Sequence, residues 1–537
     1  MDLFQITITQ PPDLLRTLCY ALPFVLFLYG IVDAFLTSNA VRKQAQYPLV
    51  GTPVSFFPKS LLNLLYTCRA TNLAQYGYEK YKNKAFQIMR NEGQIVVLPV
   101  TLLEELSRLP ANVAEGTAAL NGDLVGSFTG VDLILENRLH HSIVQRKLTP
   151  RLPLLLPQME KAVHEGFAQF MPDSEDWTVF QPYKALAYVS ARLNAEPIVG
   201  PAFSYDHNWL HTAVEFTENS PSELRSTEEF AVFRTVVVLR SVPLWMRPVV
   251  SRLLPSYWAG WKILRNGQKL LRPKIQELID MNDSGDWQPE NEKAEDLNVL
   301  SWLSGLAKGR DRNADIIGHV MIMVALATVH TTLLRMVNVI YDVVDAGPKL
   351  QQELLDEIEA VARQGWSSNS YDALSKMDSV MRESQRISPP TTMGMKRLFK
   401  QSYTFQDGTH IKAGTYVAMP VFAIENDPSN TTNPKEFDGL RAYRAAQAGD
   451  PSSAHEHLFS TPGPSFLNFG YGKTACPGRF FASVVVKMVM VKAFTEYEFK
   501  FLPGTGRPKN ILAHEFLFTW PWTKMQVRRR SKGTCPF

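Results

Sequence analysis

The chain has 537 residues, of which 45% are hydrophobic and 20% charged, and this composition excludes an intrinsically disordered protein. The net charge of +4 is small for the length, and neither a basic stripe with interleaved aromatic residues nor a zinc-finger spacing occurs, so we expect no nucleic acid as a partner. The cysteines Cys19, Cys68, Cys476 and Cys535 have no paired spacing. This spacing argues against a disulfide framework and a structural zinc site, and it indicates that the body faces the reducing cytosol.

The first forty residues, 1–40, predict a membrane anchor. The apolar run Thr17–Leu36 has the about 20 residues that a helix needs to cross a bilayer, and Asp33 is its only full charge. Arg42 and Lys43 follow the run, and the positive-inside tendency then places the bulk of the chain on the cytoplasmic side. A cleaved signal peptide is the alternative, although no clear small-x-small cleavage site follows. We therefore expect an uncleaved, single-pass anchor.

After the anchor, residues 41–54 predict a stiff hinge, because Pro48 and Pro53 cannot lie inside a regular helix. No Gly/Ser-rich or single-charge linker divides the rest of the chain. Residues 55–537 are therefore expected to form one large globular domain.

Apolar residues at three- and four-residue spacing predict that most of this domain is helical. The expected helices cover roughly residues 55–70, 102–108, 141–170, 180–195, 207–218, 225–240, 257–281, 314–345, 347–364, 371–387 and 479–494. Short β-like runs occur at 94–99, 403–420 and 497–528, and Asp407-Gly408 predicts a hairpin turn in the second of them. The expected fold class is mainly α with small β-sheets.

Residues 241–262 mix tryptophans, arginines and prolines with large apolar residues. Such a composition suits a surface that dips into a membrane interface. A loop packed on the core would give the same pattern, and the sequence does not decide between the two.

The stretch FLNFGYGKTACPGRFFA, residues 466–482, sets Cys476 among glycines. A thiolate that binds a metal needs backbone N–H groups directed at its sulfur, and Gly470, Gly472 and Gly478 would let the chain wrap closely around that atom. The apolar run that follows predicts a buried helix, whose N-terminus favours a thiolate. A buried structural cysteine is the alternative, but it does not explain the glycines.

This loop resembles the FxxGxxxCxG signature of the cytochrome P-450 monooxygenases. The resemblance implies the cytochrome P-450 fold and makes Cys476 the proximal thiolate ligand of haem b, which pushes electron density toward the iron and favours O–O cleavage. It also implies that the loop supplies cofactor-binding residues, namely Phe469, Gly470, Gly472, Cys476, Gly478 and Arg479.

The propionate side departs from the family pattern. Thr474 stands where the family usually has an arginine or histidine that contacts a haem propionate. In MKRLFKQSYTF, Arg397 lies where related proteins supply an arginine to a propionate, and a surface arginine is the alternative. The family's WxxxR motif is not present as such, which leaves His141 and Arg146 in HHSIVQRKLTP as candidates.

The segment RESQRISPP resembles the family's ExxR motif through Glu383 and Arg386, three residues apart on one helix face. Read alone, such a pair is usually a solvated surface pair. In EFDGLRAYR, Arg441 resembles the arginine that completes the motif, and the three residues would form a buried charge network in the family manner.

In ALATVHTTLLRMVNVIYDVV, the resemblance places an AGxDT-like segment over the distal haem face. Thr328 replaces the common glycine and His330 the common acid, while Thr331 keeps the threonine linked to proton delivery. Thr331 and His330 are therefore the predicted catalytic residues. The alternative is a set of core polar groups whose hydroxyls bond back to preceding carbonyls.

The chain is also similar to fungal microsomal members that oxidise secondary metabolites such as terpenoids and indole alkaloids. This similarity implies an anchor in the endoplasmic reticulum membrane, an apolar small-molecule substrate, and electrons from NADPH through a partner NADPH-cytochrome reductase. Two alternatives stay open: a haem-thiolate isomerase or dehydratase independent of O2, and a non-catalytic haem- or lipid-binding membrane protein.

Overall fold

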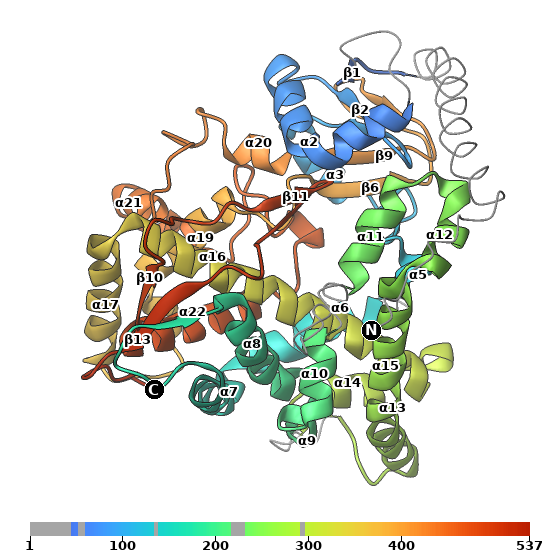
Figure 1. Cartoon of the computed structure of the whole chain (residues 1–537). Helices are drawn as coiled ribbons and strands as arrows, with labels where there is room; N and C mark the ends of the chain where they lie inside the picture. Colours follow the sequence, from blue (N-terminus) through green and yellow to red (C-terminus); the bar gives the residue numbers. More distant parts are fainter. Residues whose placement is uncertain (1–44, 52–58, 134–137, 216–230, 290–295) are drawn as a thin grey trace, which may run out of the picture.

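The computed structural model describes residues 45–51, 59–133, 138–215, 231–289 and 296–537. The predicted anchor lies outside these residues, as does much of the predicted hinge. Figure 1 shows a sheet-rich end of the molecule with α2 and β9, and a larger helical end with α7, α8 and α13.

Helices make up most of the described chain, as the periodicity predicts. Their bounds are α2 Lys59–Lys80, α3 Leu103–Arg108, α4 Gly116–Asp123, α5 Gly126–Thr129, α6 Leu139–Ile143, α7 Thr149–Phe170, α8 Pro182–Val199, α9 Pro201–Ser204, α10 His207–Glu215, α11 Ala231–Ser241, α12 Arg247–Leu253, α13 Pro255–Ser284, α14 Val299–Leu306, α15 Ala314–Ala325, α16 Thr331–Ala346, α17 Pro348–Ala362, α18 Ser370–Ala373, α19 Ser375–Ile387, α20 Val421–Glu425, α21 Arg441–Ala448 and α22 Arg479–Glu496. The mainly α class with small sheets is therefore confirmed.

The strands form four small sheets. Their bounds are β1 Leu49–Val50, β2 Phe86–Arg90, β3 Gly93–Val97, β4 Ala114–Glu115, β5 Thr178–Phe180, β6 Gly394–Phe399, β7 Tyr403–Thr404, β8 His410–Ile411, β9 Tyr416–Met419, β10 Tyr497–Phe501, β11 Ile511–Ala513, β12 Phe516–Phe518 and β13 Met525–Arg529. The largest sheet has the order β1-β2-β3-β9-β6-β4, and the others are β10-β13-β5, β11-β12 and β7-β8.

Two details differ from the sequence prediction. Part of the predicted hinge is a strand, because β1 pairs in parallel with β2 and the Pro48 carbonyl accepts from Gln87 N (2.8 Å). The run 403–420 makes the predicted hairpin only at β7 and β8, around Gly408 at φ +87°, and β9 then leaves to join the largest sheet.

The centre of the helical end is the run α15–α16, which packs against α8, α19 and α22. Among the described residues, Ala314–Ala346 is the one helical run long and apolar enough to cross a membrane by length and composition, and 61% of its apolar window is buried within the protein. We read it as a core helix, since a helix that is apolar all round is also typical of a protein interior.

A network of buried charges ties the sheet-rich end to α11. Asp123 on α4 accepts from Arg90 Nη1 (2.6 Å) and Lys396 Nζ (2.7 Å). Glu515, in the turn between β11 and β12, accepts from Lys396 Nζ (2.8 Å) and from both terminal nitrogens of Arg240 on α11 (3.2 Å each). Because buried charges are tolerated only when they are paired, this network specifies how these elements meet.

Candidate active site

The loop before α22 has the tight geometry that its glycines predict. Cys476 N donates to the Phe469 carbonyl (2.7 Å), which closes the loop on itself. Gly470 and Gly472 have φ +77° and +60°, a region that side chains rarely adopt. A Cβ atom at Gly472 would also lie 3.2 Å from Ser107 Oγ. These two glycines therefore determine the path of the loop.

Cys476 lies just before the N-terminus of α22, as predicted. Burial raises the pKa of its thiol, while the backbone N–H groups of Gly478 and Arg479 and the Arg479 charge act in the opposite direction. The Arg479 guanidinium donates to the Cys476 carbonyl (2.9 Å). Gly478 differs from the other two glycines, because its φ is −89° and its Cβ would meet only Val144, at 3.9 Å.

Cys476 opens into a cavity of about 280 Å³ that reaches across to the central helix. Phe469 and Cys476 line it on the loop side, and Ala327 and Thr331 line it on the helix side. A thiol that faces a mostly apolar slot beneath a helix is the setting that a flat, apolar metal cofactor requires.

Thr331 lines this cavity, whereas His330 does not. Thr331 Oγ1 donates to the Ala327 carbonyl (2.6 Å), and both residues line the cavity. His330 is buried, its Nδ1 lies 3.3 Å from Tyr183 Oη on α8, and its ring lies 4.9 Å from that of Phe233 on α11. Successive helix residues point about 100° apart, so the neighbours face different elements.

His330 thus occupies the position that the alternative interpretation describes, a polar group of the core. Burial lowers the pKa of His330 to about 4, so the imidazole is neutral near pH 7. The predicted pair of catalytic residues is therefore not one site in the structure.

Arg397, the predicted propionate contact, meets Thr474 at the edge of the loop. Arg397 donates to Thr474 Oγ1 (2.7 Å) and to the Lys396 carbonyl (2.8 Å). Burial, followed by the charge of Arg138, lowers the pKa of Arg397 to about 10. Within the described chain, no acidic side chain forms an ion pair with Arg397.

These residues fit a haem. A buried guanidinium that lies near a second arginine and lacks an acidic partner in the described chain suits a ligand carboxylate, which haem carries at one edge. The cavity-facing thiol of Cys476 suits the iron. Arg397, Thr474 and Cys476 would therefore hold opposite parts of the same cofactor.

Of the other propionate candidates, only His141 is linked to this edge within the described chain, through Arg138. Arg138 Nη2 lies 2.9 Å from His141 Nδ1, and burial lowers the pKa of His141 to about 3. Arg146 is exposed. The sequence analysis missed Arg138, which has a left-handed backbone (φ 54°) that no motif marks.

Glu383, Arg386 and Arg441 come together as one charge network. Glu383 accepts from Arg386 Nη2 (2.6 Å) and Nε (2.9 Å), and from Arg441 Nε (3.3 Å). Glu383 and Arg386 are buried, which distinguishes them from a solvated surface pair. Burial would raise the pKa of Glu383, but Arg386 and the other donors outweigh burial and lower it.

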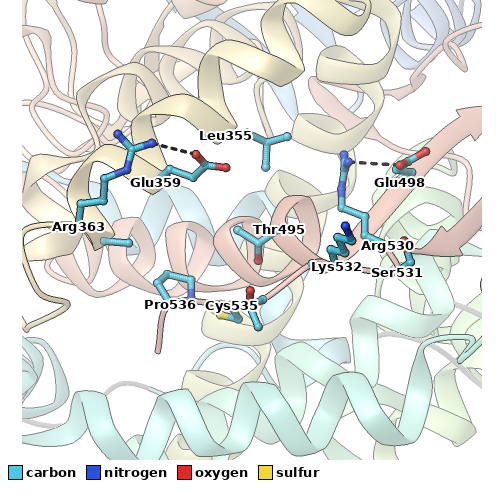
Figure 2. Close-up of a pocket in the computed structure, with 13 residues that line it drawn as sticks. Leu355, Glu359, Arg363, Thr495, Glu498, Arg530, Ser531, Lys532, Cys535 and Pro536 are labelled. Atoms are coloured by element: carbon cyan, nitrogen blue, oxygen red, sulfur yellow. Dashed lines mark hydrogen bonds and ion pairs between the residues drawn. The ribbon is translucent and has the colours of Figure 1, made fainter.

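A larger pocket of about 720 Å³ lies elsewhere, and Figure 2 shows Cys535 on its wall. Charged side chains surround it, with the pairs Glu359–Arg363 and Glu498–Arg530 at its rim. Burial raises the pKa of Cys535 to about 11, so its thiol is not activated. The lining includes none of the predicted site residues.

Residues 241–262 expose some of their large apolar side chains. Trp245 is 69% exposed, Leu253 76% and Trp258 56%. They lie at and around α12, beside α11 (Figure 1). Val250, Leu254 and Trp261 of the same segment pack against the core, so the segment has both a packed and an exposed part.

Comparisons with known proteins show which family the chain belongs to. The cytochrome P-450 family model matches residues 220–528. A cytochrome P-450 monooxygenase of Emericella nidulans is 33% identical over 94% of this chain and 92% of its own length. A cytochrome P-450 monooxygenase of Penicillium canescens is 31% identical over 95% and 93%, and an ent-kaurene oxidase of Fusarium fujikuroi is 30% identical over 95% and 92%. The chain thus belongs to the cytochrome P-450 monooxygenase family.

Proposed function

We propose that this protein is a haem-thiolate monooxygenase that takes two electrons from NADPH through a partner reductase and inserts one oxygen atom of O2 into an apolar small molecule. The observation that carries the proposal is the cavity between Thr331 and Cys476, where a thiol faces a helix hydroxyl across an apolar slot.

When bound, the haem supplies oxygen activation and oxygen transfer. The protein supplies the setting for that chemistry. Cys476 provides the thiolate on a loop that the Phe469 carbonyl closes. Arg397 and Thr474 hold the carboxylate edge. The Thr331 hydroxyl, at the cavity wall, holds an ordered water and passes protons inward.

The substrate class we propose is a secondary metabolite of the terpenoid or indole alkaloid type. The apolar character of the cavity wall supports an apolar substrate. The ent-kaurene oxidase relatives support the terpenoid type, because ent-kaurene is the compound in their name.

The location we propose is the endoplasmic reticulum membrane, with the catalytic domain in the cytosol. The apolar run Thr17–Leu36 would anchor the chain. The exposed side chains Trp245, Leu253 and Trp258 support a second contact with the membrane interface, where tryptophan is favoured.

Spectroscopy and turnover test the proposal together. The ferrous carbon monoxide complex of the wild type should show a red-shifted Soret band, Cys476→Ala should abolish it, and Cys535→Ala should keep it. Microsomes with the enzyme, a reductase and candidate scaffolds should form oxygenated product only with both O2 and NADPH. Product formed without O2 would contradict monooxygenation and favour isomerisation or dehydration. Loss of the red-shifted band in Cys535→Ala but not in Cys476→Ala would refute the assignment of Cys476 as the ligand.

A further inference from the structure

A buried carboxyl group contacts the start of the loop that carries Cys476, residues 466–478, here called the cysteine loop. Glu425, the last residue of α20, is 1% exposed. Its two oxygens accept from consecutive loop residues: Oε1 accepts from Leu467 N (2.7 Å) and Oε2 from Asn468 Nδ2 (2.6 Å). One side chain therefore fixes both the backbone and a side chain at this point.

These contacts continue toward Cys476 through the backbone. The Leu467 carbonyl accepts from Gly470 N (2.8 Å), which closes the first turn of the loop. Asn468 precedes Phe469, whose carbonyl accepts from Cys476 N (2.7 Å). Asn468 also lines the cavity that Cys476 faces. A displacement at Leu467 or Asn468 would therefore shift the sulfur.

Glu425 is an unfavourable residue to bury unless its hydrogen bonds are used. Within the described chain it forms no ion pair, and burial raises its pKa to about 8 against the opposing effects of the Leu467 N–H and Arg382. An apolar side chain of similar size would avoid that cost, but it would leave the Leu467 N–H without its acceptor and the Asn468 amide with only the longer bond to the Gln385 carbonyl (3.4 Å).

We propose that Glu425 is a positioning residue that holds the first turn of the cysteine loop, and through it the Cys476 sulfur, in register with the cofactor. This inference rests on the proposed function, because it takes Cys476 as the thiolate ligand. It assigns a role to a residue outside the loop motif.

The test uses two variants of the same size class. Glu425→Leu removes both acceptors. Glu425→Gln keeps one oxygen that accepts from Leu467 N. The new side-chain NH2 group can donate to the side-chain oxygen of Asn468 once the Asn468 amide has flipped. Asp427→Asn is the matched control, since Asp427 lies two residues on, is also buried, and accepts from Tyr78 Oη (2.8 Å) and Lys82 Nζ (2.7 Å) on and beside α2 instead of from the loop.

The readout is the rate at which the holoenzyme loses the red-shifted ferrous carbon monoxide band in mild urea, with far-UV circular dichroism followed in parallel. Glu425→Leu should lose the band at least about tenfold faster than the wild type while its helical signal persists. Loss of the hydrogen bonds to a buried carboxyl group destabilises the loop by enough to change the rate of band loss by about that factor. Glu425→Gln should restore most of the wild-type rate.

Two results would overturn the inference: band loss in Glu425→Leu no faster than in Asp427→Asn, or a Glu425→Gln variant as unstable as Glu425→Leu. A wild type without the red-shifted band would instead refute the proposed function, so the two failures are distinguishable.

Discussion

Replacing Glu515 with glutamine tests whether the buried charge network stabilises the packing of the sheet-rich end against α11. The substitution keeps the size of the side chain but removes the charge that Arg240 and Lys396 face, and it weakens the acceptor for Tyr66 Oη (3.0 Å). Removing one partner of a buried ion pair costs about 3–5 kcal/mol, because the remaining charges stay buried without compensation. We expect a loss of that size in the free energy of unfolding.

Urea unfolding at pH 7.5, followed by far-UV circular dichroism, measures this loss. Glu359→Gln is the control, because Glu359 pairs with Arg363 at the surface, where the side chains are 61% and 76% exposed, and a pair of this kind contributes about 0.5 kcal/mol or less (Figure 2). A Glu515→Gln loss no larger than that of Glu359→Gln would refute the reasoning.

The same network predicts a pH dependence. Burial alone would raise the pKa of Glu515, but Arg240 and Lys396 outweigh burial and hold the pKa well below its ordinary value. A depressed folded-state pKa contributes stability that is present above the unfolded-state pKa, about 4.3, and is lost as the pH falls through the folded-state value. The wild type should therefore lose more stability than Glu515→Gln on acidification below about pH 4.

Three further predictions concern the site and the membrane. Thr331→Ala should keep the haem spectrum but divert NADPH electrons into hydrogen peroxide, whereas His330→Ala should leave the peroxide formed per NADPH near the wild-type value. If the peroxide formed per NADPH is unchanged in both variants, the proton-handling role of Thr331 is refuted. Arg397→Ala should lower the haem content of the purified protein several-fold, by pyridine haemochrome assay, more than Lys400→Ala, which lies just after the same strand and pairs with Glu115. Equal haem content in the two variants would contradict the propionate role. Deleting residues 1–40 should move much of the protein to the soluble fraction with haem retained, and a further Trp245→Ser change should reduce the remaining membrane binding; if the deletion changes nothing, the anchor is elsewhere.

Local patterns predicted the parts of the site that depend on near neighbours in the sequence. The loop around Cys476 is marked by its own glycines, two of which have left-handed φ values. The pair Glu383 and Arg386 is set by helix spacing, although only the resemblance pointed to Arg441 as its partner. The long helices followed from periodicity because an apolar face is buried along each run, whereas α4, α14, α20 and α21 were not predicted.

The rest depends on residues that are distant in the sequence and share no spacing. Asp123, Arg240 and Glu515 meet only because α4, α11 and the β11–β12 turn pack together. Glu425 lies forty-two residues before the loop position that it holds. Strand β6, with alternating burial, was missed because its polar residues Lys396 and Arg397 are held by contacts that the sequence does not show.

His330 lies at the end of a local irregularity in the central helix. Residues Leu326–His330 form a π-helical turn between α15 and α16, which widens the helix by one residue just before the cavity. Such a turn disturbs the regular pairing of backbone groups, and the Thr331 hydroxyl donates to the Ala327 carbonyl at this point. The turn ends at His330, which contacts Tyr183, and α16 begins with Thr331 at the cavity wall. On the proposed function, this geometry assigns proton handling to the Thr331 hydroxyl and leaves His330 among the buried polar groups of the core.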